Sequence, residues 1–195
     1  MSGFNIKNRG QTPFTLGGYS QGFALVDFWQ WVACDLTNNL IRGKLAEFIV
    51  AHALGIHQLG PLQKWESHDL IFHGKRIEIK ASGYVQEWSD TINTNPRFSI
   101  RPSKKWDDTT GYGKIARRNS DIYIFCILAE FDKDLASLPI LDNWEFYPVL
   151  TVVLNERLKD QKSVCMGKIS DICSIPSTYT SLHDNLLQLI KEQSA

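Results

Sequence analysis

The sequence predicts an α/β fold in which one mixed β-sheet is covered by helices. Three observations predict it. Residues 68–86 contain two short β-type runs around a turn, and residues 121–128 are almost continuously apolar and β-rich. Helical spacing of apolar residues recurs on both sides of these segments. At 195 residues the chain is long enough to form a single domain, residues 1–195, with a substantial core.

Charge, cysteine content and the length of apolar runs limit the classes of protein to which this chain can belong. The 21 basic residues balance the 21 acidic ones, so a nucleic-acid surface must come from local clustering of basic residues. The four cysteines are scattered and indicate buried free thiols in a reducing compartment rather than a zinc site. No apolar run reaches membrane-spanning length, and the N-terminus has no signal-peptide core. We expect a cytoplasmic protein with no membrane partner.

The first 35 residues divide into two parts. Residues 1–20 are polar and glycine-containing, which indicates an irregular N-terminal arm. Residues 21–35 carry apolar side chains at helical spacing and predict a first helix. These side chains are Phe23, Val26, Trp29, Val32 and Ala33, with Phe28 and Trp31 beside them. We expect the aromatic residues to lie in the core rather than to form a base-stacking surface.

A second helix is predicted between the capping residues 37–39 and Gly55. Its expected buried stripe consists of Ile41, Leu45, Phe48, Ile49 and His52. Glu47 lies off that stripe, with a small residue four positions away on either side. Small neighbours would let its carboxylate approach another element or a substrate. The alternative is an exposed glutamate paired with Lys44.

The segment 68–86 predicts a β-hairpin with strands 69–72 and 76–81 around the turn 73–75. With a loop of two or four residues, Asp69 lies directly opposite Glu78, and alternation places Glu78 and Lys80 on one face. Opposed carboxylates repel, and a hard cation such as Mg²⁺ removes that repulsion. The alternative is a solvated charged face with an ordinary Glu–Lys pair.

Basic residues concentrate in 97–118, where aromatic residues and glycines are interleaved. After a polar loop at 87–95 and a short strand at 97–100, this region predicts a flexible basic loop. Such a loop suits contact with phosphates, and a plain solvated loop is the alternative. The candidate nucleic-acid-binding residues are Arg101, Lys104, Lys105, Lys114, Arg117 and Arg118.

Three further elements follow. Residues 121–128 predict a strand covered on both faces. Residues 144–154 predict a strand in which Pro148 indicates an edge or a break, and 163–166 predict a short edge strand. Residues 179–192 predict a C-terminal amphipathic helix.

The order of these features resembles a known pattern. A helical Glu47, then Asp69, then Glu78-Ile79-Lys80 on the following strand is similar to the PD-(D/E)xK phosphodiesterase superfamily, which has the restriction-endonuclease-like fold. His68 stands where that motif usually has proline. A longer signature resembles a group of uncharacterised bacterial proteins within the superfamily. It comprises residues 42–47, Trp65, 69–70, 77–88, 121–125 and 144–147.

The resemblance implies a three-layer fold and a metal site. Asp69 and Glu78 would bind Mg²⁺, with Mn²⁺ as a substitute, and the carbonyl of Ile79 would be a third ligand. Glu47 would bind a water of the metal shell or a second metal ion. Each role is carried over from the resemblance to the matching position of this chain.

The resemblance also implies the remaining roles. Lys80 would hold the attacking water or stabilise charge on the phosphate, and Gln86 would be an extra polar residue facing the site. The expected activity is that of a Mg²⁺-dependent endodeoxyribonuclease, and cutting both strands would call for a homodimer. The alternatives are a catalytically inactive nucleic-acid-binding or regulatory module, and a structural protein with a charged hairpin face.

Overall fold

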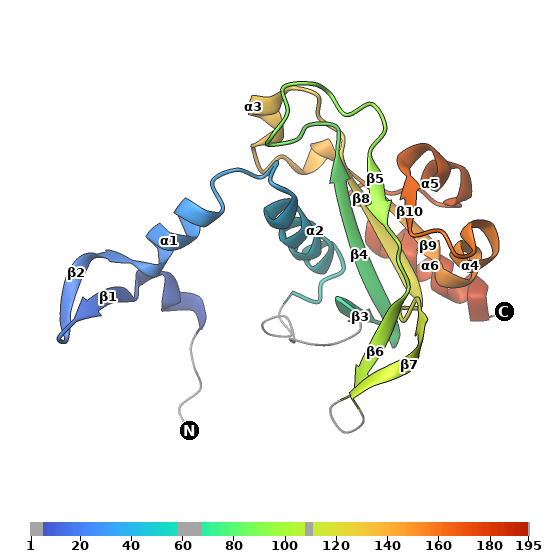
Figure 1. Cartoon of the computed structure of the whole chain (residues 1–195), viewed down its shortest axis with the longest axis horizontal. Helices are drawn as coiled ribbons and strands as arrows, with labels where there is room; N and C mark the ends of the chain where they lie inside the picture. The colour runs from blue at the N-terminus through green and yellow to red at the C-terminus, as the bar shows by residue number, and fades with distance from the viewer. Residues whose placement is uncertain (1–5, 58–67, 108–110, 195) are drawn as a thin grey trace.

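The computed structural model describes residues 6–57, 68–107 and 111–194 (Figure 1). The connection expected at 61–65 lies outside these residues. The central sheet, as far as the chain is described, has four strands in the order β3-β4-β8-β9. They are β3 (Leu70–Phe72), β4 (Lys75–Gly83), β8 (Ile122–Leu128) and β9 (Trp144–Leu150). β4 and β8 are parallel and the outer pairs are antiparallel, so the mixed α/β sheet predicted from the sequence is confirmed.

Strand β8 holds the two cores together. All seven of its residues are buried, as predicted for a strand covered on both faces. On one face it packs with α2 (Asn39–Ala53) and α6 (Leu182–Ser194) through Ile122, Ile124, Cys126 and Leu128. On the other face Tyr123, Phe125 and Ile127 contribute to a second core.

The second core is closed by short elements. β5 (Arg97–Ser99) and β10 (Ser163–Cys165) form an antiparallel pair, which confirms both predicted short strands. α4 (Thr151–Leu158) and α5 (Met166–Ile172) complete this layer. The predicted strand 144–154 is wrong after residue 150, because Leu154 and Leu158 are buried together on one face of α4. Pro148 lies on the edge strand β9, as predicted.

Helix α2 begins and ends as predicted, but its buried face is different. Asn38 accepts hydrogen bonds from the N–H groups of Leu40 and Ile41, and Gly55 follows the helix with a φ of 71°. Phe48 of the expected stripe is 59% exposed. The buried residues are Arg42, Ala46, Glu47, Ile49 and Val50. Glu47 therefore faces inward, which corrects its predicted position off the buried face.

The N-terminal region is an ordered projection (Figure 1). It consists of η1 (Ile6–Gln11), β1 (Pro13–Leu16), β2 (Tyr19–Ala24) and α1 (Leu25–Val32). The predicted irregular arm is wrong, because Gly17 and Gly18 adopt positive φ and close a hairpin. The predicted helix 21–35 is shorter, and α1 contains no buried residue. Its aromatic side chains are not in the core.

The predicted flexible basic loop is also wrong. β6 (Ser103–Asp107) and β7 (Gly111–Arg117) form an antiparallel pair that extends from the body (Figure 1). α3 (Lys133–Ala136) and η2 (Leu141–Asn143) connect β8 to β9. All four thiols are free, but Cys34 is exposed and Cys165 is half-buried, against the expectation that all are buried. Within the described residues, no helix combines the length and apolar character that crossing a membrane requires.

Candidate active site

The β3–β4 hairpin sets the geometry of the site. His73 and Gly74 have φ values of 47° and 74°, as in a two-residue type I′ turn. Leu70 pairs with Ile77, so the predicted register is confirmed. The pairing ends at Leu70, and Asp69, one residue before it, lies close enough to Glu78 for the Glu78 charge to raise its pKa. The N–H of Asp69 donates to the Ile77 carbonyl at 2.9 Å, which holds Asp69 in line with the strand.

The surroundings of Asp69 disfavour the ionised form of its carboxylate. Its Oδ2 accepts a hydrogen bond from the N–H of Ile79 at 2.7 Å. Burial, and then the negative charge of Glu78, raises the pKa of Asp69 to about 6, against the lowering effects of the Ile79 bond and of Lys80. Glu47 raises the same pKa, so three carboxylates lie within electrostatic range of one another.

Glu78 is held by groups from two strands. Its Oε1 accepts from the Lys80 ammonium at 2.5 Å, and its Oε2 accepts from the Ser120 hydroxyl at 3.2 Å. Burial, and then Glu78, raises the pKa of Tyr123 to about 12. Ser120 and Tyr123 approach Glu78 because β4 and β8 are parallel neighbours. Sequence reasoning missed Ser120, since nothing local indicated which strand pairs with β4.

Glu47 is both paired with Lys44 and close to the carboxylate of Asp69, which are the two situations that the sequence left open. Both of its carboxylate oxygens lie 2.8 Å from the Lys44 ammonium. The Lys44 side chain is 60% exposed and that of Glu47 only 11%. Glu47 thus has the expected i,i−3 partner, yet it lies close enough to Asp69 to raise the pKa of that group.

Gln86 is buried and bound by the protein itself. Its amide donates to the Gly83 carbonyl at 2.8 Å and accepts from Arg42 at 3.3 Å. Arg42 also donates to the carbonyls of Thr37 and Val85, and burial lowers its pKa to about 10. Sequence reasoning did not assign this role to Arg42. Its signal was an arginine among small and apolar residues within the helix.

The candidate nucleic-acid-binding residues differ in exposure. Arg101, Lys104 and Arg117 are exposed. Arg118 is buried, and its guanidinium donates to three acceptors: the Ile100 carbonyl, Asn155 Oδ1 and the Gln161 carbonyl. The side chains of Lys105 (β6) and Lys114 (β7) lie outside the described set.

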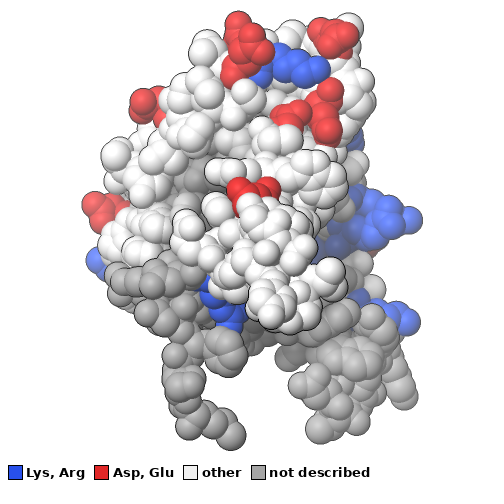
Figure 2. Space-filling model, turned by 90° about the vertical axis from the view of Figure 1, so that its left-hand side faces the viewer, with Lys and Arg blue, Asp and Glu red and all other residues white. Residues whose placement is uncertain are grey.

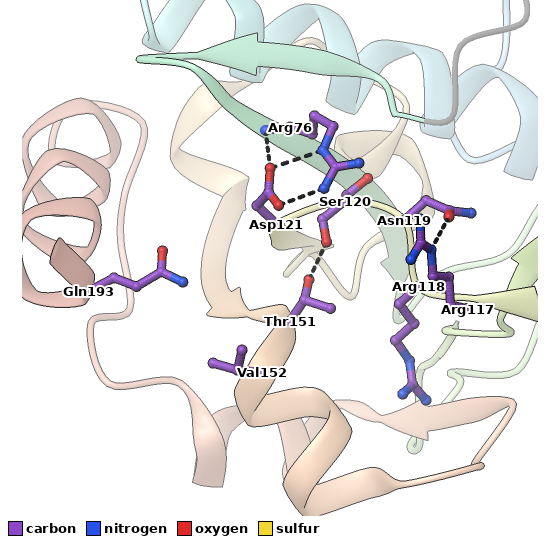
Figure 3. Close-up of a pocket in the computed structure, with 9 residues that line it drawn as sticks. All are labelled: Arg76, Arg117, Arg118, Asn119, Ser120, Asp121, Thr151, Val152 and Gln193. Carbon is purple, nitrogen blue, oxygen red and sulfur yellow. Dashed lines mark hydrogen bonds and ion pairs between the residues drawn. The ribbon is translucent and has the colours of Figure 1, made fainter. Parts of the chain in front are cut away.

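A pocket of about 240 Å³ lies between Arg76, residues 117–121 and the start of α4 (Figure 3). Arg76 and Asp121 form a two-pronged ion pair at one end, with nitrogen–oxygen distances of 3.0 and 2.7 Å. Ser120 lines the pocket and contacts Glu78. The pocket therefore adjoins the carboxylates and the base of the β6–β7 pair. Its lining residues are Arg76, Arg117, Arg118, Asn119, Ser120, Asp121, Thr151, Val152 and Gln193.

The donor set suits a hard divalent cation. It offers two neighbouring carboxylates and a main-chain carbonyl, all oxygen, and the pKa of Asp69 is raised first by burial and then by the negative charge of Glu78. In the described ranges, no group of three or more His, Cys, Asp or Glu side chains comes together in a metal-binding arrangement. Any metal would therefore take main-chain, water or substrate oxygens beside the two carboxylates.

Comparisons with known proteins identify no family for this chain but a distant structural neighbour. No family model matches the sequence, and no curated protein matches it. Among solved structures, the chain is similar to a bacterial homing endonuclease, I-Ssp6803I. The TM-score is 0.41 at 14% identity, over 80% of this chain and 97% of that one. The functional assignment of this chain rests on its own residues.

Proposed function

We propose that this chain is a Mg²⁺-dependent endodeoxyribonuclease of the PD-(D/E)xK type, with Mn²⁺ as an alternative ion. The observation that supports the proposal is the proximity of Asp69 to Glu78 and Glu47, whose charges raise its pKa, together with the Lys80 ammonium bound to Glu78. A buried carboxylate beside a second one raises the free energy of the folded state, and the Lys80 ammonium on Glu78 offsets only part of this cost for Asp69. A retained electrostatic cost of this kind is typical of a functional site.

The proposed role of each residue is the one that the resemblance implies. Asp69, Glu78 and the Ile79 carbonyl would hold the metal ion, which when bound supplies a water of lowered pKa and polarises the phosphodiester. Glu47 would bind a water molecule in the shell of the same ion. Lys80, now paired with Glu78, would turn its ammonium toward the water or the phosphate oxygens as the carboxylate engages the metal.

The substrate is proposed to be DNA on the grounds of local charge. The β6–β7 pair carries exposed basic residues beside a pocket lined by three arginines, one of which is neutralised by Asp121. Such a surface suits contact with the phosphate backbone. The pocket would receive a phosphate next to the one that is cleaved. Gln86 would stay a positioning residue, since its amide is bound by Gly83 and Arg42.

A nicking assay tests the proposal. Supercoiled plasmid is incubated with the wild type, Asp69→Asn or Lys80→Met, in Mg²⁺, Mn²⁺ or a chelator. We expect cleavage that requires the metal and falls by about 10²-fold or more in each variant. Matched controls are Asp90→Asn and Lys191→Met, which change exposed residues outside the site and should keep full activity.

Two outcomes would count against the nuclease. Cleavage that survives in both site variants would mean that the active site lies elsewhere. If the wild type binds duplex DNA but never cleaves it, and shows no Mg²⁺ affinity that depends on Asp69 and Glu78, the chain is a binding module. Parallel arms with single-stranded DNA and RNA define the substrate.

A further inference from the structure

The N-terminal arm, residues 6–32, is a folded unit that projects from the body of the molecule (Figure 1). Its elements are joined to one another. The rings of Phe14 and Phe23 stack with centroids 4.7 Å apart, and the N–H of Leu25 donates to the Thr12 carbonyl at 3.0 Å. Gly10 approaches the ring of Trp29 so closely that a Cβ there would lie 3.3 Å from it. The arm thus keeps its shape without a large contact to the body.

The surface of this arm is strongly apolar. Among the described residues of the arm, eight large apolar side chains are between 40 and 79% exposed. They are Phe14, Leu16, Tyr19, Phe23, Phe28, Trp29, Trp31 and Val32. Monomeric proteins rarely expose apolar patches of more than a few hundred Å². A patch of this kind on a projecting element indicates an interaction surface.

Charge limits what the partner can be. Between Gly10 and Cys34, Asp27 is the one charged residue of the sequence, and its carboxylate accepts the N–H of Ala24 at 2.7 Å. Figure 2, viewed from the side of the arm, shows a mostly uncharged face with an acidic side chain near its middle and charged side chains around its margins. A nucleic acid needs Lys and Arg, which are missing from this stretch. The stretch that carries the exposed apolar side chains therefore favours an apolar, uncharged partner surface.

We propose that the partner is a second copy of this chain, bound arm to arm about a two-fold axis. The same patch on both copies is complementary to itself, because it is apolar, rich in aromatic residues and almost without charge. Eight side chains, about half exposed at roughly 200 Å² each, present roughly 800 Å². That is about what each partner buries in a stable interface. The net charge of +0 sets no long-range repulsion between the copies.

This dimer does not depend on the proposed chemistry. It uses residues 14–32, none of which belongs to the carboxylate site. If the chain is a nuclease, the two-fold axis would supply the second active site needed to cut both strands of a duplex. If it is not, the interface would still form. The two proposals can therefore fail separately.

Sedimentation velocity on the full chain across a dilution series tests the dimer. We expect a species of twice the 22.2 kDa monomer mass that dissociates on dilution. Leu16→Glu and Trp31→Glu change side chains that are 73 and 77% exposed in one copy, so folding should be unaffected. Each should weaken self-association by about tenfold or more. Ile115→Glu, at a 78% exposed position outside the arm, and Asp69→Asn should associate like the wild type.

Three results would overturn the dimer. One is a wild type that stays monomeric at every concentration. Another is a dimer that Leu16→Glu and Trp31→Glu leave intact, which would place the interface elsewhere. The third is a monomer that binds vesicles of a neutral phospholipid through the arm. Far-ultraviolet circular dichroism of both variants, expected to match the wild type, separates a lost interface from a lost fold.

Discussion

Replacing Asp69 by asparagine should stabilise the protein, and by an amount that depends on pH. The pKa of Asp69 is raised from its ordinary 3.8 to about 6, so the folded state binds its proton more tightly than the unfolded state. Stability is therefore lost as the pH rises from about 4 to about 6. At 1.36 kcal/mol per pKa unit, the loss is at most about 3 kcal/mol above pH 7. Asparagine cannot ionise, so the variant does not lose this stability as the pH rises.

Urea unfolding followed by circular dichroism, in chelator, measures this difference. Asp69→Asn should exceed the wild type by up to about 3 kcal/mol at pH 8 and match it near pH 4. For a chain of this size that is a rise in Tm of about 6–12 °C at the higher pH. The amide oxygen can still accept from Ile79, so the hairpin is kept. Mg²⁺ should narrow the gap, because it stabilises the wild type alone.

The reasoning fails if the two proteins have the same stability at pH 8, or if their difference does not change between pH 4 and 8. Either result would mean that Asp69 is not held in a desolvated site beside Glu78. Asp90→Asn is the matched control. The Asp90 side chain is fully exposed, so its replacement should leave the pH dependence of unfolding unchanged.

Three further predictions concern stability and are measured by chemical denaturation. Asp121→Asn should cost roughly 1 kcal/mol near neutral pH after allowing for exposure, because Arg76 lowers the pKa of Asp121; the contribution is lost as the pH falls through about 4. Arg42→Lys should cost about 2–3 kcal/mol, since an ammonium cannot reach all the acceptors that the guanidinium binds. Leu154→Ala should cost about 2–5 kcal/mol, whereas Val152→Ala, exposed on the same helix, should change stability little.

The features predicted correctly depend on neighbours in the chain. A two-residue turn and strict alternation along β3 and β4 are enough to pair Leu70 with Ile77. The cap at Asn38 needs only the first turn of α2. The continuous apolar run of β8 requires cover on both faces, whatever provides it.

The errors arise where a pattern has more than one physical solution. Aromatic residues at helical spacing indicate an apolar face, but they do not say whether the chain's own body or a second surface covers it. The pattern around Trp29 and Trp31 therefore predicts a core position, whereas both side chains lie outside the core. Apolar stripes on α2 likewise left its rotation open by one position, which decides whether Glu47 faces inward.

The sequence by itself determined the register of the β3–β4 hairpin and the mixed sheet, because local turn geometry and side-chain periodicity specify them. Only the tertiary structure decided the parallel pairing of β4 with β8, which brings Ser120 to Glu78, and the inward rotation of Glu47. Contacts between segments more than forty residues apart depend on how the whole core packs. The burial that raises the pKa of Asp69 is also decided by the tertiary structure, since it requires the helices and the sheet together.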